Sequence, residues 1–258
     1  MSAAIEFRNV CVAVPTGRSL LDGISLVLEE GTTTAVLGRS GSGKTTLLRL
    51  VNRMVEPTSG EVFVYGKDVR AGDVISLRRK MGYVIQETGL FPHFPVERNV
   101  GLVLEAEGRP HKDRRGHTHE LLGMVGLDSD HFARRFPHQL SGGQRQRVGL
   151  ARALAADPDI LLMDEPFGAL DPLTRGEMQD MMRSLLARLQ KTVLLVTHDL
   201  DEALFLGDRI VLLSEGKVIA NLGREEFMQS DLPEIRAYTR AYHRNERNGM
   251  ETKRSEKE

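Results

Sequence analysis

The sequence predicts an α/β domain with a parallel β-sheet, and two observations support this fold class. Short apolar runs typical of buried strands ("TTTAVLG", "DILLMDE", "TVLLVTHD") alternate with runs of helical periodicity ("KTTLLRLVNRM", "LTRGEMQDMMRSLLARLQ"). Such alternation is typical of parallel strands joined by helices. In addition, the glycine-rich segment "GRSGSGKTT" lies between a strand and a helix, where α/β proteins bind phosphate groups.

The other elements follow in chain order. The first thirty residues contain two β-rich runs, "IEFRNVCVAV" and "ISLVLEEG", separated by a turn around Pro15. "EVFVYGKDV" predicts a hairpin and "MGYVIQ" a strand, whereas residues 92–135 are more polar and predict helices, chiefly "VGLVLEAEG" and "HELLGMVGL". After the helical run "LDEALFLG", "DRIVLLSEGKVIANLG" predicts a closing hairpin that turns at Glu215 and Gly216. We expect the polar end, "NERNGMETKRSEKE", to fray.

Composition restricts the classes of function. The chain has 258 residues, of which 40% are hydrophobic and 28% charged, so it can hold one large globular domain or one domain with a small appendage. The net charge of -1 gives no basic excess, and we expect no nucleic-acid partner. The single cysteine, Cys11, indicates a reducing compartment. We find no signal peptide and no membrane span in the sequence, and expect a cytosolic protein unless a partner holds it at a membrane.

The segment Gly38-Arg39-Ser40-Gly41-Ser42-Gly43-Lys44-Thr45 matches the phosphate-loop (Walker A) pattern G-x-x-x-x-G-K-[ST], and Thr46 follows it. Glycines let the backbone wrap a phosphate, whose charge is neutralised by successive amides and by the dipole of the next helix. We expect Lys44 to reach the β- and γ-phosphates and the Thr45 hydroxyl to bind Mg²⁺. A glycine-rich turn with a chance lysine is the alternative, which the flanking strand and helix disfavour.

Two later strands end in polar side chains. "ILLMDE" ends in Asp164 and Glu165, and buried strands rarely end in paired acids without a cation or a proton to handle. Asp164 fits a holder of Mg²⁺, and Glu165 could polarise an attacking water. The alternative is a loop carboxylate that caps the next helix. "TVLLVTHD" places His198 at a strand end near the expected γ-phosphate, although a lone histidine there is more often a hydrogen-bonded core residue.

A second anion site is predicted about a hundred residues after the phosphate loop. Ser141-Gly142-Gly143, followed by Gln144, opens a helix-forming segment whose first amides have no partner within the helix. The same residues also suit a plain helix cap. The chain has one phosphate loop and no internal repeat, so it is one nucleotide-binding unit.

In order, these motifs resemble those of ATP-binding cassette (ABC) ATPases over residues 4–222. They are the phosphate loop, Gln86 in "GYVIQ", the signature "LSGGQ" at Leu140–Gln144, "ILLMDE", "GALD" ending at Asp171, and His198. The resemblance implies a phosphate-loop NTPase core with a parallel sheet, an antiparallel β subdomain and an inserted α-helical subdomain at about residues 90–157. Residues 223–258 are then a short polar tail, helical or disordered.

The resemblance also implies that two copies dimerise around two ATP, each ATP lying between one copy's phosphate loop and the other's signature, Ser141–Gln144. Thr45, Gln86 and Asp164 would hold Mg²⁺. Glu165, as a base or as a water-orienting group, and His198 would act on the attacking water. Gln86 would link the site to the helical region, and Asp171 would cross the dimer seam. The implied activity is hydrolysis of ATP to ADP and phosphate.

One position departs from the family's pattern. These ATPases usually stack the adenine on an aromatic residue about two dozen positions before the phosphate loop, and "VCVAVPTG" has Val14 there. We expect the base to stack more weakly, by on the order of 1 kcal/mol.

Partners and localisation follow from the resemblance. A stand-alone cassette would dock on membrane permease subunits served by a periplasmic or lipid-anchored solute-binding protein, at the cytoplasmic face of the inner membrane. "VNRMVEPTSGEV", "MGYVIQETGLFPH" and the run around the signature are most similar to ATPases that import osmoprotectants such as glycine betaine, choline or carnitine. Many of those carry C-terminal regulatory domains that this sequence lacks, so regulation by that route is not expected.

The motifs leave other functions open. Another small-solute importer or a lipid-trafficking system would share the motifs, and a regulatory or DNA-repair ATPase is less favoured. A small-molecule kinase would need an acceptor pocket and has no use for "LSGGQ". The stretch "RPHKDRRGHTHE", with His111, His117 and His119, could indicate a metal site, but a solvated charged loop of the helical region is favoured.

Overall fold

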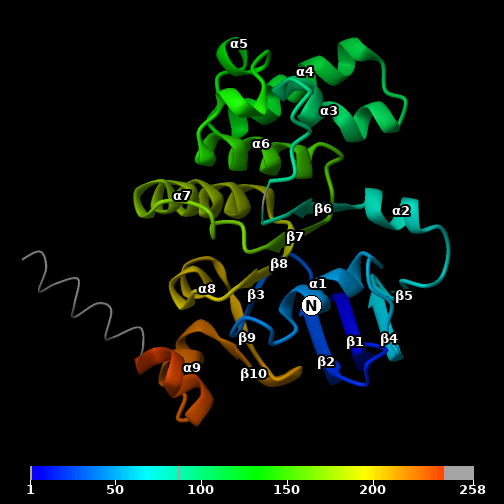
Figure 1. The fold of residues 1–258 in the computed structure, drawn as a ribbon, viewed down its shortest axis with the longest axis vertical. Coiled ribbons are helices and arrows are strands. Elements are labelled where there is room, and N and C mark those ends of the chain that lie inside the picture. Colours follow the sequence, from blue (N-terminus) through cyan, green and yellow to red (C-terminus); the bar gives the residue numbers. More distant parts are fainter. Residues whose placement is uncertain (1, 87, 241–258) are drawn as a thin grey trace, which may run out of the picture.

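The computed structural model describes residues 2–86 and 88–240, whose strands form two sheets (Figure 1). The larger sheet has the order β10-β9-β3-β8-β7-β6. All its strands are parallel except β10, which is antiparallel to β9. Their bounds are β3 (Thr33–Leu37), β6 (Met81–Val84), β7 (Ile160–Asp164), β8 (Thr192–Thr197), β9 (Arg209–Ser214) and β10 (Lys217–Gly223). The predicted parallel sheet and closing hairpin are therefore confirmed.

The smaller sheet is antiparallel, with the order β2-β1-β4-β5. Its strands are β1 (Ala3–Ala13), β2 (Ser19–Glu29), β4 (Ser59–Val64) and β5 (Lys67–Asp68). The hairpin predicted from "EVFVYGKDV" is β4 and β5, which pair Phe63 with Asp68. Alternate residues of β1 and β2 are buried, so this sheet has one face on the core.

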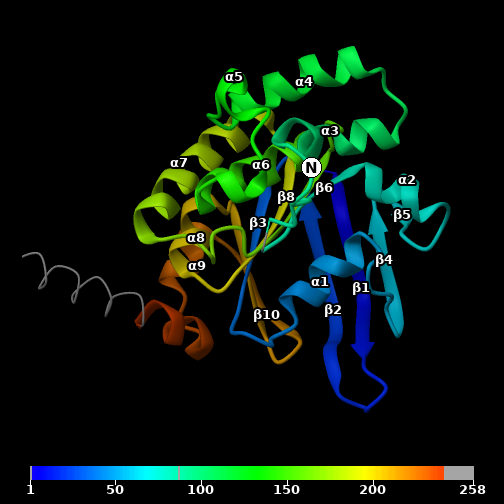
Figure 2. The ribbon, with the colours of Figure 1, turned by 45° about the horizontal axis from the view of Figure 1, so that its top comes forward.

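Helices cover both faces of the larger sheet, and four of them form a group beyond β6 (Figures 1 and 2). The group is α3 (Val96–Ala106), α4 (His111–Met124), α5 (Ser129–Phe132) and α6 (Gly142–Leu154), with a 3₁₀ turn at Pro137–Gln139. The others are α1 (Lys44–Val51), α2 (Val74–Arg79), α7 (Pro172–Leu189), α8 (Leu200–Leu206) and α9 (Arg224–Gln229). None of the helices in the described ranges has the length and apolar character needed to cross a membrane.

Alternation along the central strands divides the core into two clusters. Ile160 and Leu162 of β7 pack with α1 and the antiparallel sheet, whereas Leu161 and Met163 pack on the other side with α3, α4, α6, α7 and α8. The methionine-rich face of α7 belongs to the second cluster: Met178, Met182 and Leu185 are buried. This face of α7 is therefore part of the core.

One expectation is wrong. The charged stretch after Pro110 is not a loop but the first half of α4, which begins at His111. Pro110 is its N-cap residue, and Thr118, Leu121 and Leu122 bury one face of the helix. Packing of that narrow apolar face therefore stabilises the helix, although its sequence has only a weak helical pattern. The end predicted to fray, residues 245–258, lies outside the described residues.

The parallel register places the candidate residues at one edge of the sheet. Leu37, the last residue of β3, pairs with Thr197 at the end of β8, and Asp164 of β7 pairs with Val196. The phosphate loop follows β3, Asp164 ends β7 and is followed by Glu165, and His198 follows β8. Open α/β sheets bind ligands at this carboxyl edge.

Candidate functional site

The phosphate loop connects β3 to α1 and is built around close backbone contacts. Gly41 and Gly43 have φ of 79° and 105°, in the left-handed region that favours glycine. A β-carbon on Gly43 would lie 2.7 Å from the Leu20 carbonyl oxygen. The loop therefore needs glycine both for its turn and for its packing, and it leaves the amino end of α1 open to an anion.

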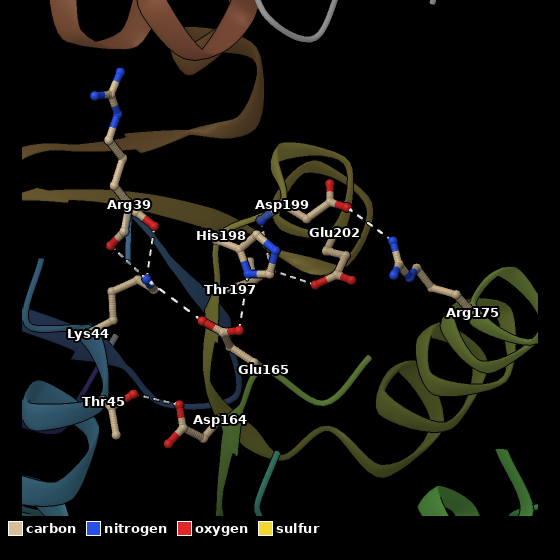
Figure 3. Close-up of polar contacts among 11 residues, drawn as sticks. Arg39, Lys44, Thr45, Asp164, Glu165, Arg175, Thr197, His198, Asp199 and Glu202 are labelled. Carbon is tan, nitrogen blue, oxygen red and sulfur yellow. Dashed lines mark hydrogen bonds and ion pairs between the residues drawn. The ribbon is translucent and has the colours of Figure 1, made fainter. Parts of the chain in front are cut away.

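Lys44 is folded over this loop. Its ammonium group donates hydrogen bonds to the carbonyl oxygens of Gly38, at 2.9 Å, and Arg39, at 3.1 Å, and lies 3.9 Å from Glu165 Oε1 (Figure 3). The Lys44 side chain is only 4% exposed. Burial lowers the pKa of Lys44, and the negative charges of Glu165 and Asp164 oppose that decrease. A phosphate group would give this buried cation a second partner of opposite charge, in addition to Glu165.

Oxygen ligands for a cation lie beside the lysine. The Thr45 hydroxyl donates to Asp164 Oδ1 at 2.9 Å, and Asp164 is buried at the end of β7. Tyr83 Oη lies 3.4 Å from the other carboxylate oxygen, and burial raises the pKa of that tyrosine. A hydroxyl and a carboxylate in contact at the mouth of a phosphate loop are a donor set that suits Mg²⁺.

Glu165 has a strained backbone, with φ of 46°, although it is not glycine. Its amide donates to the Val196 carbonyl oxygen of β8 at 2.9 Å, and its carbonyl accepts from Gly168 at 3.2 Å. These bonds hold the turn and aim the carboxylate toward Lys44 and His198 (Figure 3). Strained residues of this kind cluster where a side chain must point in one direction.

His198 completes the group. Its Nδ1 atom lies 3.1 Å from Glu165 Oε2, and its side chain is 59% exposed, so it is not a core histidine. Lys44, Glu165 and His198 therefore form one chain of contacts across three strands (Figure 3).

A pocket of about 350 Å³ lies at these residues. It is lined by Arg18, Leu20, Ser40, Gly41, Gly43, Lys44, Thr45, Thr46, Gln86 and Glu165. Within the described chain, Val14 is not part of this lining, and Arg18 and Leu20 are the contributors from that region. The aliphatic and guanidinium groups there could cover a base without an aromatic ring.

The signature lies elsewhere. Ser141 is the N-cap residue of α6: its hydroxyl accepts from the Gln144 amide at 3.2 Å, and Gln144 Oε1 accepts from the Ser141 amide at 2.9 Å. Among the residues that line the phosphate-loop pocket, as far as the chain is described, none comes from Leu140–Gln144. The two predicted anion sites therefore do not meet, and α6 is apart from α1 in both views (Figures 1 and 2).

Asp171 caps the next helix instead of entering the pocket. It is the N-cap residue of α7, and its carboxylate accepts from the Thr174 amide at 3.1 Å. Hydrogen bonds from the Thr174 side chain and amide lower the pKa of Asp171. Its position is exposed, beside the signature helix.

Sequence reasoning missed four residues around this group: Tyr83, Arg175, Thr197 and Glu202. Thr197 and Glu202 are buried in contact with each other, and Arg175 lies 3.8 Å from Asp199 (Figure 3). "THDLDEA" contains three acidic residues in seven positions, and nothing in that pattern indicates which one turns inward. The helical phase of α8, set by its packing on the sheet, decides this.

The histidine-rich stretch makes structural contacts. His117 Nε2 lies 3.1 Å from the Ala155 carbonyl oxygen, and His119 Nε2 lies 3.5 Å from Glu97. In the described part of the chain, no group of three or more histidine, cysteine or acidic residues is arranged to hold a metal ion.

A family model described as ABC transporter matches residues 21–168. The chain is 48% identical over 217 residues to the glycine betaine uptake system ATP-binding protein YehX of Escherichia coli, covering 83% of this chain and 69% of that protein. It is 39% identical over 249 residues to the choline transport ATP-binding protein OpuBA of Bacillus subtilis, covering 90% and 65%.

The chain thus spans less than two thirds of the Bacillus protein's length. Among solved structures, a dimeric bacterial ABC transporter cassette is similar with a TM-score of 0.77 and 36% identity, covering 85% of this chain and 98% of that one.

Proposed function

The chain belongs to the ABC transporter family, and from that premise we propose that it is the ATP-binding and ATP-hydrolysing subunit of an osmoprotectant importer. One observation carries this proposal. Lys44 and Glu165 line the pocket of the phosphate loop and His198 contacts Glu165, while the signature at Ser141 does not line this pocket in the described part of the same copy. The two halves of a closed nucleotide site therefore come from two copies.

In the proposed mechanism the phosphate loop binds the triphosphate. The amides of Gly41 to Thr46 and the Lys44 ammonium neutralise its charge, and Lys44 exchanges its bonds to loop carbonyls for bonds to phosphate oxygens. Thr45 and Asp164 would hold Mg²⁺, with Gln86 at the edge of the pocket. Bound there, the ion would neutralise charge that develops on the transferred phosphate.

The pair of Glu165 and His198 acts on water. Glu165 either accepts a proton from the attacking water or orients it, and His198 holds that carboxylate in place from its Nδ1 side. The exposed face of His198 is then free to meet the γ-phosphate. Because water attacks next to a strained, fixed carboxylate, little rearrangement is needed in the transition state.

The partner copy closes the site with Ser141, the amides of Gly142 and Gly143, and the dipole of α6. Asp171, fixed at the start of α7 beside α6, would cross the seam. ATP then holds two copies together, and its hydrolysis removes the shared γ-phosphate and releases them.

The proposed partners and solute follow the relatives. The dimer would dock on integral membrane permease subunits at the cytoplasmic face of the inner membrane, and a solute-binding protein would deliver the solute. Glycine betaine, choline or carnitine is the proposed cargo, because YehX and OpuBA are named for glycine betaine and choline transport. The proposed ATPase domain spans residues 4–222 and includes the helical subdomain at about 90–157. The polar tail, residues 223–258, follows the domain.

The dimer is tested with Glu165→Gln in the full chain. This variant should bind ATP, lose turnover by on the order of 100-fold or more, and elute as a dimer in ATP by light scattering. Glu177→Gln, the same change at an exposed position of α7, should behave like the wild type. A Glu165→Gln chain that binds ATP and stays monomeric overturns the two-copy site.

The solute is tested by uptake. Cells that produce the wild-type chain with its permease should accumulate labelled glycine betaine, choline or carnitine, and cells with Glu165→Gln should not. Equal uptake in the two strains overturns the osmoprotectant assignment while leaving ATP hydrolysis to be judged on the purified protein.

A further inference from the structure

The hydroxyl group of Thr197 restrains the turn that carries His198, because it bonds to the residue that follows the histidine. Thr197, the last residue of β8, is 1% exposed. Its Oγ1 atom accepts a hydrogen bond from the Asp199 amide at 3.0 Å. The residues immediately before and after His198 are thereby tied together, so the backbone of the histidine has little freedom.

That hydroxyl is itself fixed by a buried acid. Thr197 Oγ1 donates to Glu202 Oε2 at 2.5 Å, and Glu202 is 4% exposed on the inner face of α8 (Figure 3). An unpaired carboxyl group in this position would be costly, and an apolar side chain would fill the site without that cost. Packing alone therefore does not explain why a carboxyl group, and not an apolar side chain, occupies this position.

A third contact restrains the same turn. Asp199 caps α8 by accepting from the Asp201 amide at 2.8 Å, and its other carboxylate oxygen lies 3.8 Å from Arg175 Nη1. Arg175 belongs to α7 and also donates to the Leu170 carbonyl oxygen at 3.3 Å. Contacts with β8, with α8 and with the start of α7 thus restrain this turn.

We propose that Glu202 is a positioning residue for His198: by accepting the Thr197 hydroxyl hydrogen, it fixes the turn that holds the imidazole against Glu165. This inference rests on the proposed ATPase function. Glu202 does not touch the reacting atoms, and its effect reaches them through Thr197 and the backbone of His198. A displacement of the imidazole by about 1 Å is enough to lower turnover on the order of 100-fold.

The test compares matched variants of the full chain. Thr197→Val and Glu202→Leu should lower kcat for ATP by about 10- to 100-fold while ATP affinity changes less than about twofold. Thr197→Ser and Glu202→Gln keep the donor and the acceptor, and should stay within about threefold of wild type. If Glu202→Leu does not fold, the comparison of Thr197→Val with Thr197→Ser still tests the proposal.

Thr192→Val is the control. Thr192 lies at the other end of β8, is also 1% exposed, and its hydroxyl accepts from the Gly31 amide at 3.0 Å. The same substitution on the same strand should therefore cost similar stability but leave kcat within about twofold. Equal losses of kcat in Thr192→Val and Thr197→Val overturn the proposal.

A double-mutant cycle separates positioning from general weakening of the fold. If Glu202 acts through His198, adding Glu202→Leu to His198→Ala should lower kcat further by less than about twofold. The same fold-loss in both backgrounds overturns the positioning role. A wild-type chain that does not hydrolyse ATP overturns the proposed function and this inference with it, whereas hydrolysis equal in all variants overturns only the inference.

Discussion

Gly143 of the signature helix and Thr174 of α7 are packed so closely that a β-carbon on the glycine would lie 2.4 Å from Thr174 Cγ2. At the adjacent Gly142 a β-carbon would find only Leu170 Cδ2, at an ordinary 3.7 Å. The second signature glycine is therefore needed to pack α6 against α7, apart from any contact with a nucleotide. Because Thr174 also donates its amide to Asp171, the signature and Asp171 are held on one rigid surface.

Gly143→Ala should destabilise the fold. The added methyl group forces α6 and α7 apart or moves Thr174, and overpacking of this kind costs about 1–3 kcal/mol in the free energy of unfolding by urea. Gly142→Ala is the matched control and should change that free energy by less than about 1 kcal/mol. Adding Thr174→Ser, which removes the clashing methyl group, should recover most of the loss; no recovery would contradict the packing argument.

Ser141→Arg tests the signature as part of the partner's site. Ser141 is exposed at the start of α6, so the chain should fold with the larger side chain, at a cost of about 1 kcal/mol for the lost cap. A fluorescent nucleotide should still bind the monomer, because the pocket of the phosphate loop is unchanged. Hydrolysis should be abolished, and Ser184→Arg, at an exposed position of α7, should leave it intact. If Ser141→Arg retains turnover, the signature is not part of the site.

Glu202 should make stability depend on pH in a defined direction. Burial raises the pKa of Glu202 above its ordinary value of 4.5, and the Thr197 hydrogen bond and nearby Arg175 oppose that rise. The folded chain therefore binds this proton more tightly than the unfolded chain. The stability contributed by the protonated form is present below pH 4.5 and is lost as the pH rises through the folded pKa.

The measurement is the melting temperature of Glu202→Gln and of the wild type from pH 4 to pH 8. Since the amide does not titrate, the melting temperature of Glu202→Gln should rise relative to that of the wild type as the pH rises. Exposed Glu177→Gln should show no such trend. A difference between Glu202→Gln and wild type that is constant across this range would show that Glu202 has an ordinary pKa in the folded chain.

Much of the fold could be predicted because the determining signals are local. Buried strands such as "DILLMDE" have no polar interruption, and the positive φ of Glu215 and Gly216 matches the predicted turn. The charged first half of α4 could not be predicted as helix, because the charged residues of α4 outnumber the three buried side chains that dock it. Its helix depends on neighbours that are distant in sequence.

The candidate site divides in the same way. Lys44, Thr45 and Asp164 stand in motifs whose spacing alone indicates phosphate and cation chemistry, and the strand register then places them together. Glu202 and Arg175 carry no such signal. A glutamate near a helix start is usually solvated, and only the docking of α8 on the sheet turns this one inward.

The class of fold, the phosphate loop, the acidic strand end and the signature can be predicted from the sequence, because each depends on residue types within a few positions of one another. The tertiary structure decided which of these meet. Parallel strands bring the loop, Glu165 and His198 to one edge, while α6 carries the signature to another surface. The reason is that contact between distant segments is set by how apolar faces pack in three dimensions, and this information is spread over the whole chain.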